Sequence, residues 1–166
     1  GPAIIWKNGV ATTLVGDGSA ANKIFVADND VYVVGTTHSA DGSLNAVYWK
    51  NGVLNTLGKG TGMAIVVNGN DVYVAGFIIG NNPAYDDAAI WRNGTLTDLG
   101  PGEAFAITMS GSDVYVAGYS VGNANTPIAS YWKNGTLTTL GGGEGDGIAV
   151  QGSDVYVSGY SNVLIN

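Results

Sequence analysis

The chain has 166 residues, of which 45% are hydrophobic and only 11% are charged, with a net charge of −7 and a pI of about 4.2. This length and composition predict one folded domain, and the acidic balance argues against nucleic acid and anionic membranes as partners. The absence of cysteine excludes disulfides and thiolate metal sites, and no apolar run reaches the roughly 18 residues of a membrane span. No signal peptide is recognised, and Gly1-Pro2 resembles the remnant of a cleaved expression tag.

Two motifs recur and divide the chain into four similar parts. The motif W-[KR]-N-G begins at Trp6, Trp49, Trp91 and Trp132. The motif D-V-Y-V begins at Asp30, Asp71, Asp113 and Asp154. Successive copies lie 41 to 43 residues apart. A period of about 42 residues indicates one supersecondary unit, and such units stack to bury their apolar faces.

The chain begins with a predicted hairpin. A short strand at residues 3–6 precedes Asn8-Gly9, and a second strand ends at Leu14. Asn-Gly accepts the two positive φ angles of a type I′ turn, so it is the strongest short-range hairpin signal in the chain. The same hairpin is expected at residues 46–57, 88–99 and 129–140.

A second kind of hairpin follows the first. It consists of an apolar strand at residues 23–26, a tight turn, and a strand that begins at Asp30. Its copies begin at Ala64, Ala106 and Ile148, and all but the last copy lead through a longer loop into the next Asn-Gly hairpin. Each complete unit therefore contains four short strands, which we call a to d in chain order.

Four antiparallel strands in about 42 residues predict a blade of an all-β β-propeller. A β-solenoid fits less well because its coils are shorter, and a sandwich does not require four copies of one unit. Residues 1–166 would form a single propeller domain with a c–d half-blade at the N-terminus, three complete blades, and an a–b half-blade at the C-terminus. The ring would close within one chain as a four-bladed monomer, or between two chains as an eight-bladed homodimer. The tag remnant Gly1-Pro2 indicates that the ends of the chain were selected, which favours the homodimer. An open propeller would leave unpaired strand edges.

The repeat resembles the bacterial extracellular repeats of the HAF type. The matching residues are Val116-Ala117-Gly118, Ala129-Ser130-Tyr131-Trp132, Asn134-Gly135 and Leu140-Gly141, with their counterparts in the other copies. The His-Ala-Phe stretch of that family is replaced by Ala-Xaa-[IY]-Trp. The resemblance implies a bacterial repeat protein, secreted or at the cell surface, and it transfers no catalytic residues.

The recurring polar and aromatic residues have simple structural interpretations. The D-V-Y-V aspartates are expected to cap turns, and the tryptophans are expected to fill the space between neighbouring blades. Arg92, which replaces lysine in one copy, is expected to be a solvated cation. We predict no catalytic, cofactor or metal site. Four carboxylates lie in the d–a connections without a common offset, and they define an enzyme hypothesis: Asp17, Glu103, Glu144 and Asp146.

The ligand-binding candidates lie where the repeats differ most, in the b–c loops at residues 36–45, 77–87 and 119–128. They are Tyr85, Asp86, Asp87, His38 and Asp41. The leading interpretation is a non-enzymatic scaffold, either natural or an excised or engineered propeller fragment, that assembles with itself. The alternative is a lectin-like or peptide-binding module that uses these loops or the central channel.

Overall fold

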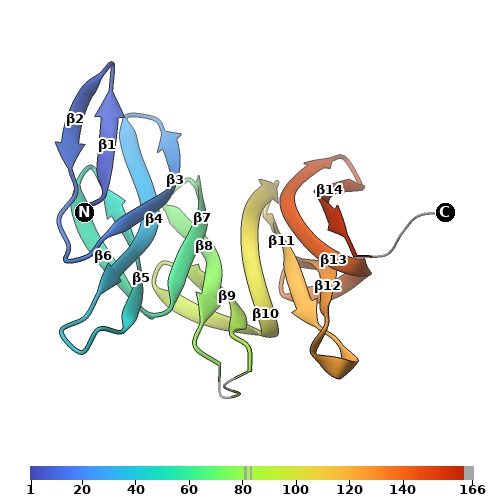
Figure 1. Cartoon of the computed structure of the whole chain (residues 1–166). Coiled ribbons are helices and arrows are strands. Elements are labelled where there is room, and N and C mark those ends of the chain that lie inside the picture. Colours follow the sequence, from blue (N-terminus) through green and yellow to red (C-terminus); the bar gives the residue numbers. More distant parts are fainter. Residues whose placement is uncertain (81, 83, 163–166) are drawn as a thin grey trace.

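In the computed structural model the chain is all-β, as predicted, and every strand pairing is antiparallel (Figure 1). The structure describes residues 1–80, 82 and 84–162, so Asn81 and Pro83 of the predicted second loop lie outside the described residues. The strands are β1 (Ile4–Lys7), β2 (Val10–Thr13), β3 (Ala20–Ala27), β4 (Asp30–His38), β5 (Leu44–Lys50), β6 (Val53–Lys59), β7 (Thr61–Asn68), β8 (Asp71–Ile78), β9 (Asp87–Arg92), β10 (Thr95–Ser110), β11 (Asp113–Val121), β12 (Pro127–Lys133), β13 (Thr136–Gln151) and β14 (Asp154–Ser161). One short 3₁₀ helix, η1 (Asn123–Asn125), lies between β11 and β12.

The strands form three complete four-stranded repeats between two half-repeats. The first repeat is β3-β4-β5-β6, and the hydrogen-bonded order then continues through eight strands from β7 to β14. It continues because β10 and β13 each serve two repeats: residues 95–101 pair with β9, and residues 102–110 pair with β11. In β13, residues 136–142 pair with β12 and residues 143–151 pair with β14. The strands that were predicted to end at Leu99 and Leu140 therefore continue into the next repeat. The backbone stays extended through the connection, and register shifts accommodate the change of partner.

The Asn-Gly turns have the backbone that the sequence predicts. Asn8, Asn51, Asn93 and Asn134 have φ angles of 50–51°, and the glycines that follow them have φ angles of 82–83°. Two successive positive φ angles match the right-handed twist of the flanking strands. These turns fix the register of each c–d pair, with Lys50 opposite Val53 in the first repeat.

The core lies between successive repeats and is built from two different faces. We define the tyrosine face of the second repeat as Tyr73, Ala75, Ala88 and Ile90, and the tryptophan face of the third as Val114, Val116 and Trp132. These residues form one buried cluster. The same arrangement joins the first repeat to the second, and Trp49 of the first packs on the N-terminal half-repeat. Three of the four tryptophans thus fill the space between repeats, as predicted.

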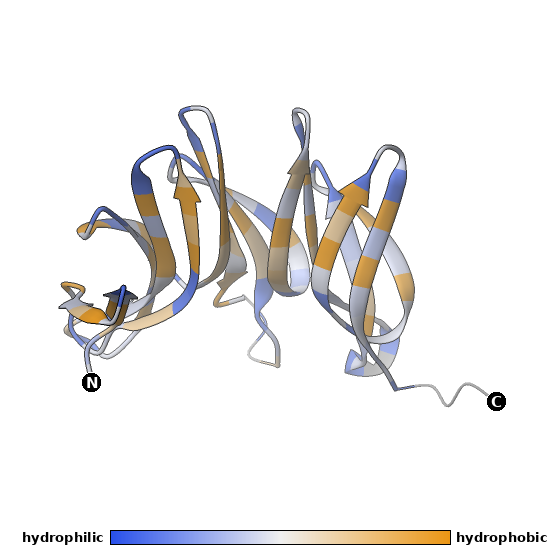
Figure 2. Cartoon of the chain, turned by 90° about the horizontal axis from the view of Figure 1, so that it is seen from above, coloured by the Kyte–Doolittle hydropathy of each residue, from blue (hydrophilic) through white to orange (hydrophobic). Residues whose placement is uncertain are grey.

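The two half-repeats lie at opposite ends of an open arc (Figures 1 and 2). Among the described strands, β1 and β2 pair only with each other, and β14 pairs only with β13. The described part of one chain therefore does not join its half-repeats into a closed ring.

Candidate functional site

A polar cluster beside the Asn-Gly turn of each complete repeat corrects the expected role of the D-V-Y-V aspartates. In the second repeat the Asn93 Oδ1 atom accepts the backbone N–H of Val72 at 2.9 Å, so asparagine and not aspartate caps this strand. Asp71 accepts hydrogen bonds from the Asn93 amide at 2.6 Å and from Arg92 at 2.7 Å. These two bonds lower the pKa of the Asp71 carboxyl, so it stays ionised.

The cation of this cluster also contacts an aromatic ring. The Arg92 side chain is 61% exposed, as expected for a solvated cation, and its guanidinium also lies 5.5 Å from the centre of the Tyr73 ring, a contact that was not predicted. The other two complete repeats have the same cluster, with Lys50 and Lys133 in place of Arg92. The fourth copy is divided between the ends of the chain, with Lys7 and Asn8 at one end and Asp154 and Tyr156 at the other.

The b–c loops and the d–a connections lie together on one side of the strands, which we call the loop face. Backbone hydrogen bonds join them in the first two complete repeats: His38 N–H to Asp17, Gly60 N–H to Leu44, and Gly102 N–H to Asp86. The sequence-predicted loop residues and the carboxylates of the connections therefore occupy the same side of the molecule.

The structure places the five ligand-binding candidates in two separate groups. His38 is exposed at the end of β4 with its Nδ1 atom 2.9 Å from the Gly18 carbonyl, and Asp41 accepts hydrogen bonds from the backbone and hydroxyl of Ser43. The bonds to Ser43 lower the pKa of Asp41. Tyr85, Asp86 and Asp87 are partly buried at the start of β9, in the second group.

Two of the carboxylates in the d–a connections occupy equivalent positions. Glu103 lies opposite Tyr119 in β10–β11, and Glu144 lies opposite Tyr160 in β13–β14. The prediction that these carboxylates share no offset is therefore wrong for this pair. The signal was present in the sequence, because Glu103 and Glu144 each lie 12 residues after the tryptophan of their repeat, Trp91 and Trp132. The partner tyrosines lie on the neighbouring strand, and only the pairing of the strands brings them to the carboxylates.

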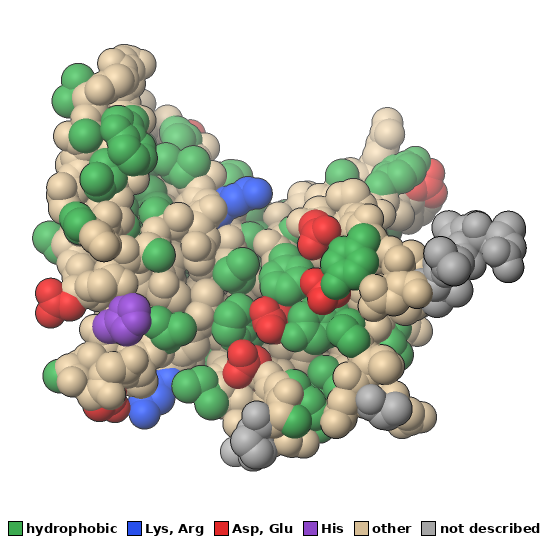
Figure 3. All heavy atoms as spheres, viewed as in Figure 1, with side chains coloured by type: hydrophobic (Ala, Val, Ile, Leu, Met, Phe, Trp, Pro, Cys, Tyr) green, Lys and Arg blue, Asp and Glu red, His purple; other side chains and the backbone are tan. Residues whose placement is uncertain are grey.

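Glu103 has the most perturbed environment of these carboxylates. The Tyr119 hydroxyl donates a hydrogen bond to its Oε1 atom at 2.8 Å, and the Tyr119 ring packs against Phe105. Burial raises the pKa of Glu103, and the charges of Asp86 and Glu144 raise it further. Carboxylates and hydrophobic side chains alternate over this part of the surface (Figure 3).

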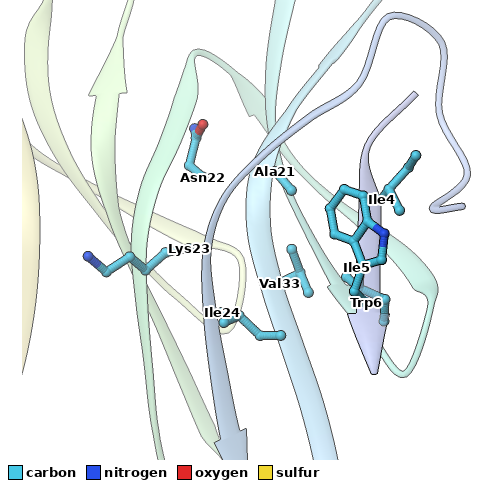
Figure 4. Close-up of a pocket in the computed structure, with 8 residues that line it drawn as sticks. All are labelled: Ile4, Ile5, Trp6, Ala21, Asn22, Lys23, Ile24 and Val33. Atoms are coloured by element: carbon cyan, nitrogen blue, oxygen red, sulfur yellow. The ribbon is translucent and has the colours of Figure 1, made fainter. Parts of the chain in front are cut away.

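A hollow of about 400 Å³ lies at the N-terminal end of the arc (Figure 4). It is lined by Ile4, Ile5 and Trp6 of β1 and by residues of β3 and β4 that include Ile24 and Val33. Trp6 is 66% exposed, whereas the equivalent tryptophans of the complete repeats are at most 1% exposed. Ile24 is likewise exposed, whereas the equivalent Ile65 is buried. The expected burial of every tryptophan between repeats is thus wrong for Trp6, because among the described residues no repeat packs on its side of β1.

The C-terminal end exposes a complementary surface. Tyr156 is 57% exposed, whereas Tyr32, Tyr73 and Tyr115 at the same position are all buried. Tyr160 and Leu140 are also half exposed. Each end of the arc therefore presents to solvent a face that the interior repeats bury against a neighbour.

Within residues 1–80, 82 and 84–162, no three His, Asp or Glu side chains lie close enough together to hold a metal ion. No helix of these residues is long and apolar enough to cross a membrane. No family model and no curated protein matches the sequence. The resemblance to HAF-type repeats stays a prediction.

Proposed function

We propose that this chain is a non-enzymatic repeat scaffold of the β-propeller class, with its repeats as blades. The observation that supports this most directly is the shared core between successive repeats, in which a tyrosine face packs on a tryptophan face. The residues that recur in every complete repeat pack in that core or bind at the Asn-Gly turns. The residues of the recurring motifs thus serve folding and the stacking of repeats.

The half-repeats support completion of a ring. The N-terminal half supplies strands c and d of one blade, and the C-terminal half supplies strands a and b. Together they contain all the parts of the polar cluster that each complete repeat forms at its turn. The resemblance to HAF-type repeats adds a bacterial setting outside the cytoplasm to this proposal.

A crystal structure tests the proposed architecture. We expect blades arranged around a central axis, with the first strands of the blades, β3, β7 and the second half of β10, nearest that axis. A straight stack of repeats, or a sandwich in which the repeats pair face to face, would refute the propeller.

A second candidate function is ligand binding on the loop face. The observation that favours it is the group formed by Glu103, Tyr119 and Phe105, in which a carboxylate lies beside aromatic rings, as in many carbohydrate sites. A glycan array and a peptide library test this candidate. Binding that is lost in Glu103→Gln and retained in Asp41→Asn would support it, and no binding by the unmodified protein would reject it.

A further inference from the structure

We propose that the partner that completes the ring is a second copy of this chain, and that β14 of each copy pairs with β1 of the other in one defined register. This inference rests on the proposed function and adds to it the partner and the contacts between β14 and β1. We call this pairing of β14 with β1 of the other copy the joint. Two such joints would connect two copies, and the four repeats of each would give a ring of eight. A head-to-tail contact that closes in this way leaves no unpaired edge on β1 or β14.

The complete repeats give the register of the joint. Strands b and c pair with Tyr32 opposite Lys50, Tyr73 opposite Arg92, and Tyr115 opposite Lys133. The equivalent residues of the half-repeats are Tyr156 and Lys7. Antiparallel pairing from that point places Val157 opposite Trp6 and Ser158 opposite Ile5.

This register reassembles the fourth polar cluster. Lys7 of one copy meets Asp154 of the other, as Lys50 meets Asp30 at 2.7 Å and Lys133 meets Asp113 at 2.9 Å. Asn8 then reaches the backbone N–H of Val155, as Asn134 reaches that of Val114. The joint thus pairs two exposed, oppositely charged groups and caps one strand end.

The same register buries the exposed apolar residues of both ends. Tyr32 shares a buried cluster with Ile65, Val72 and Trp91 of the next repeat. The equivalent neighbours of Tyr156 are Ile24, Val31 and Trp49 of the second copy, and of these the exposed Ile24 lines the hollow shown in Figure 4.

Trp6 is buried in the same way on the other side of the joint. Trp132 packs on Tyr73 and Ala75 of the preceding repeat. Trp6 of the second copy would pack on the equivalent Tyr115 and Ala117. The strand edges, the charges and the apolar faces therefore complement one another in a single arrangement.

The shape of the arc favours a second copy over closure within one chain. The two half-repeats lie at opposite ends in both views (Figures 1 and 2). To bring them together, every interface between repeats would have to open or tilt. These interfaces bury Trp49, Trp91 and Trp132 almost completely, and such packed cores resist repacking.

Cysteine cross-linking tests the joint, because the chain has no cysteine of its own. Ile5 and Ser158 are equivalent to Ile90 and Ala75, which face each other in β8–β9. Asn93 N–H donates to the Val72 carbonyl, so by alternation Ala75 and Ile90 form a non-hydrogen-bonded pair, in which side chains lie closest. That geometry suits a disulfide.

The variants are Ile5→Cys and Ser158→Cys, prepared separately and mixed, and the double variant. The control mixes Ile5→Cys with Val157→Cys, whose side chain points to the other face of the strand.

We expect the mixed single variants to form a linked pair of chains on oxidation, and the double variant to form a two-chain species with no free thiol. The control mixture should remain unlinked. A double variant that loses its thiols within one chain would overturn the second-copy inference and leave the propeller standing. Folded protein with no link in any preparation would overturn ring completion itself. A ladder of longer products would overturn closure with two copies.

Charge reversal gives an independent test at exposed positions that do not affect the core. Lys7→Glu or Asp154→Lys alone would put like charges at both joints, whereas mixing the two variants would restore opposite charges at both. We expect the mixture to associate with a several-fold lower dissociation constant than either variant alone. No gain on mixing would contradict the second-copy joint, because a ring closed within one chain cannot exchange partners.

Discussion

Replacing Trp91 by alanine tests the packing between repeats. Trp91 is 1% exposed and shares a cluster with Val34 and Ala46 of the preceding repeat. An aromatic side chain of this kind buries about 150–250 Å². At about 25 cal/mol per Å², its burial contributes about 4–6 kcal/mol, and measured Trp-to-Ala losses are about 3–5 kcal/mol. We therefore expect the free energy of unfolding to fall by about 3–5 kcal/mol.

The assay is urea unfolding followed by far-ultraviolet circular dichroism, with the midpoint and slope compared between variants. Trp6→Ala is the matched control, measured in dilute protein. Since about two thirds of Trp6 is exposed in the single chain, its loss should be about a third of that for Trp91 wherever the protein is a single chain, and should approach that for Trp91 wherever two copies complete the ring. A loss below about 1 kcal/mol for Trp91→Ala would refute the stacking of tryptophan faces on tyrosine faces.

Three further variants test local features. Gly76→Ala should reduce stability by about 3 kcal/mol or more, because its added Cβ would collide with the Thr61 carbonyl oxygen across β7–β8; a thermal midpoint close to that of the unmodified protein would contradict this. Glu103→Gln should raise the free energy of unfolding at pH 7. Because the folded-state pKa of Glu103 is raised, this carboxyl group contributes favourably to stability below about pH 4, and that contribution is lost as the pH rises through the folded-state pKa. Urea midpoints at pH 4 and pH 7 check this, and a variant less stable than the unmodified protein at pH 7 would count against it. Asp71→Asn should act in the opposite direction, because the pKa of Asp71 is lowered and its contribution is lost as the pH falls below about 4. The free energy of unfolding should therefore fall less on acidification in the variant than in the unmodified protein. An equal fall in the two proteins would show that the Asp71 cluster does not cause the loss of stability at low pH.

The repeat unit was predictable because local rules determine most of it. Asn-Gly defines its turn by backbone preference, and the alternation in D-V-Y-V separates Tyr73 from Val72 and Val74 onto opposite faces. Both features appear in the structure at the predicted positions. The continuous strands β10 and β13 were not predictable in this way, because glycine-rich sequence also favours turns. There, each strand pairs with one neighbour up to the connection and with another neighbour directly after it, and this pairing keeps the backbone extended.

The candidate sites were less predictable, because their residues meet across strands. Asp71, Arg92 and Asn93 meet only when β8 pairs with β9 in one register, so the sequence suggested a local turn cap instead. The Glu103–Tyr119 pair likewise depends on a bulge in β10 that shifts the register by one residue. The exposure of Trp6 depends on whether a repeat packs on its side of β1, and no motif within residues 1–14 predicts that.

The mass of the unmodified protein in solution tests the central claim most directly. Light scattering behind a sizing column, over a range of concentrations, should give twice the 16.9 kDa chain mass, because each copy completes the other's divided repeat. A mass of 16.9 kDa at every concentration would contradict the second-copy ring.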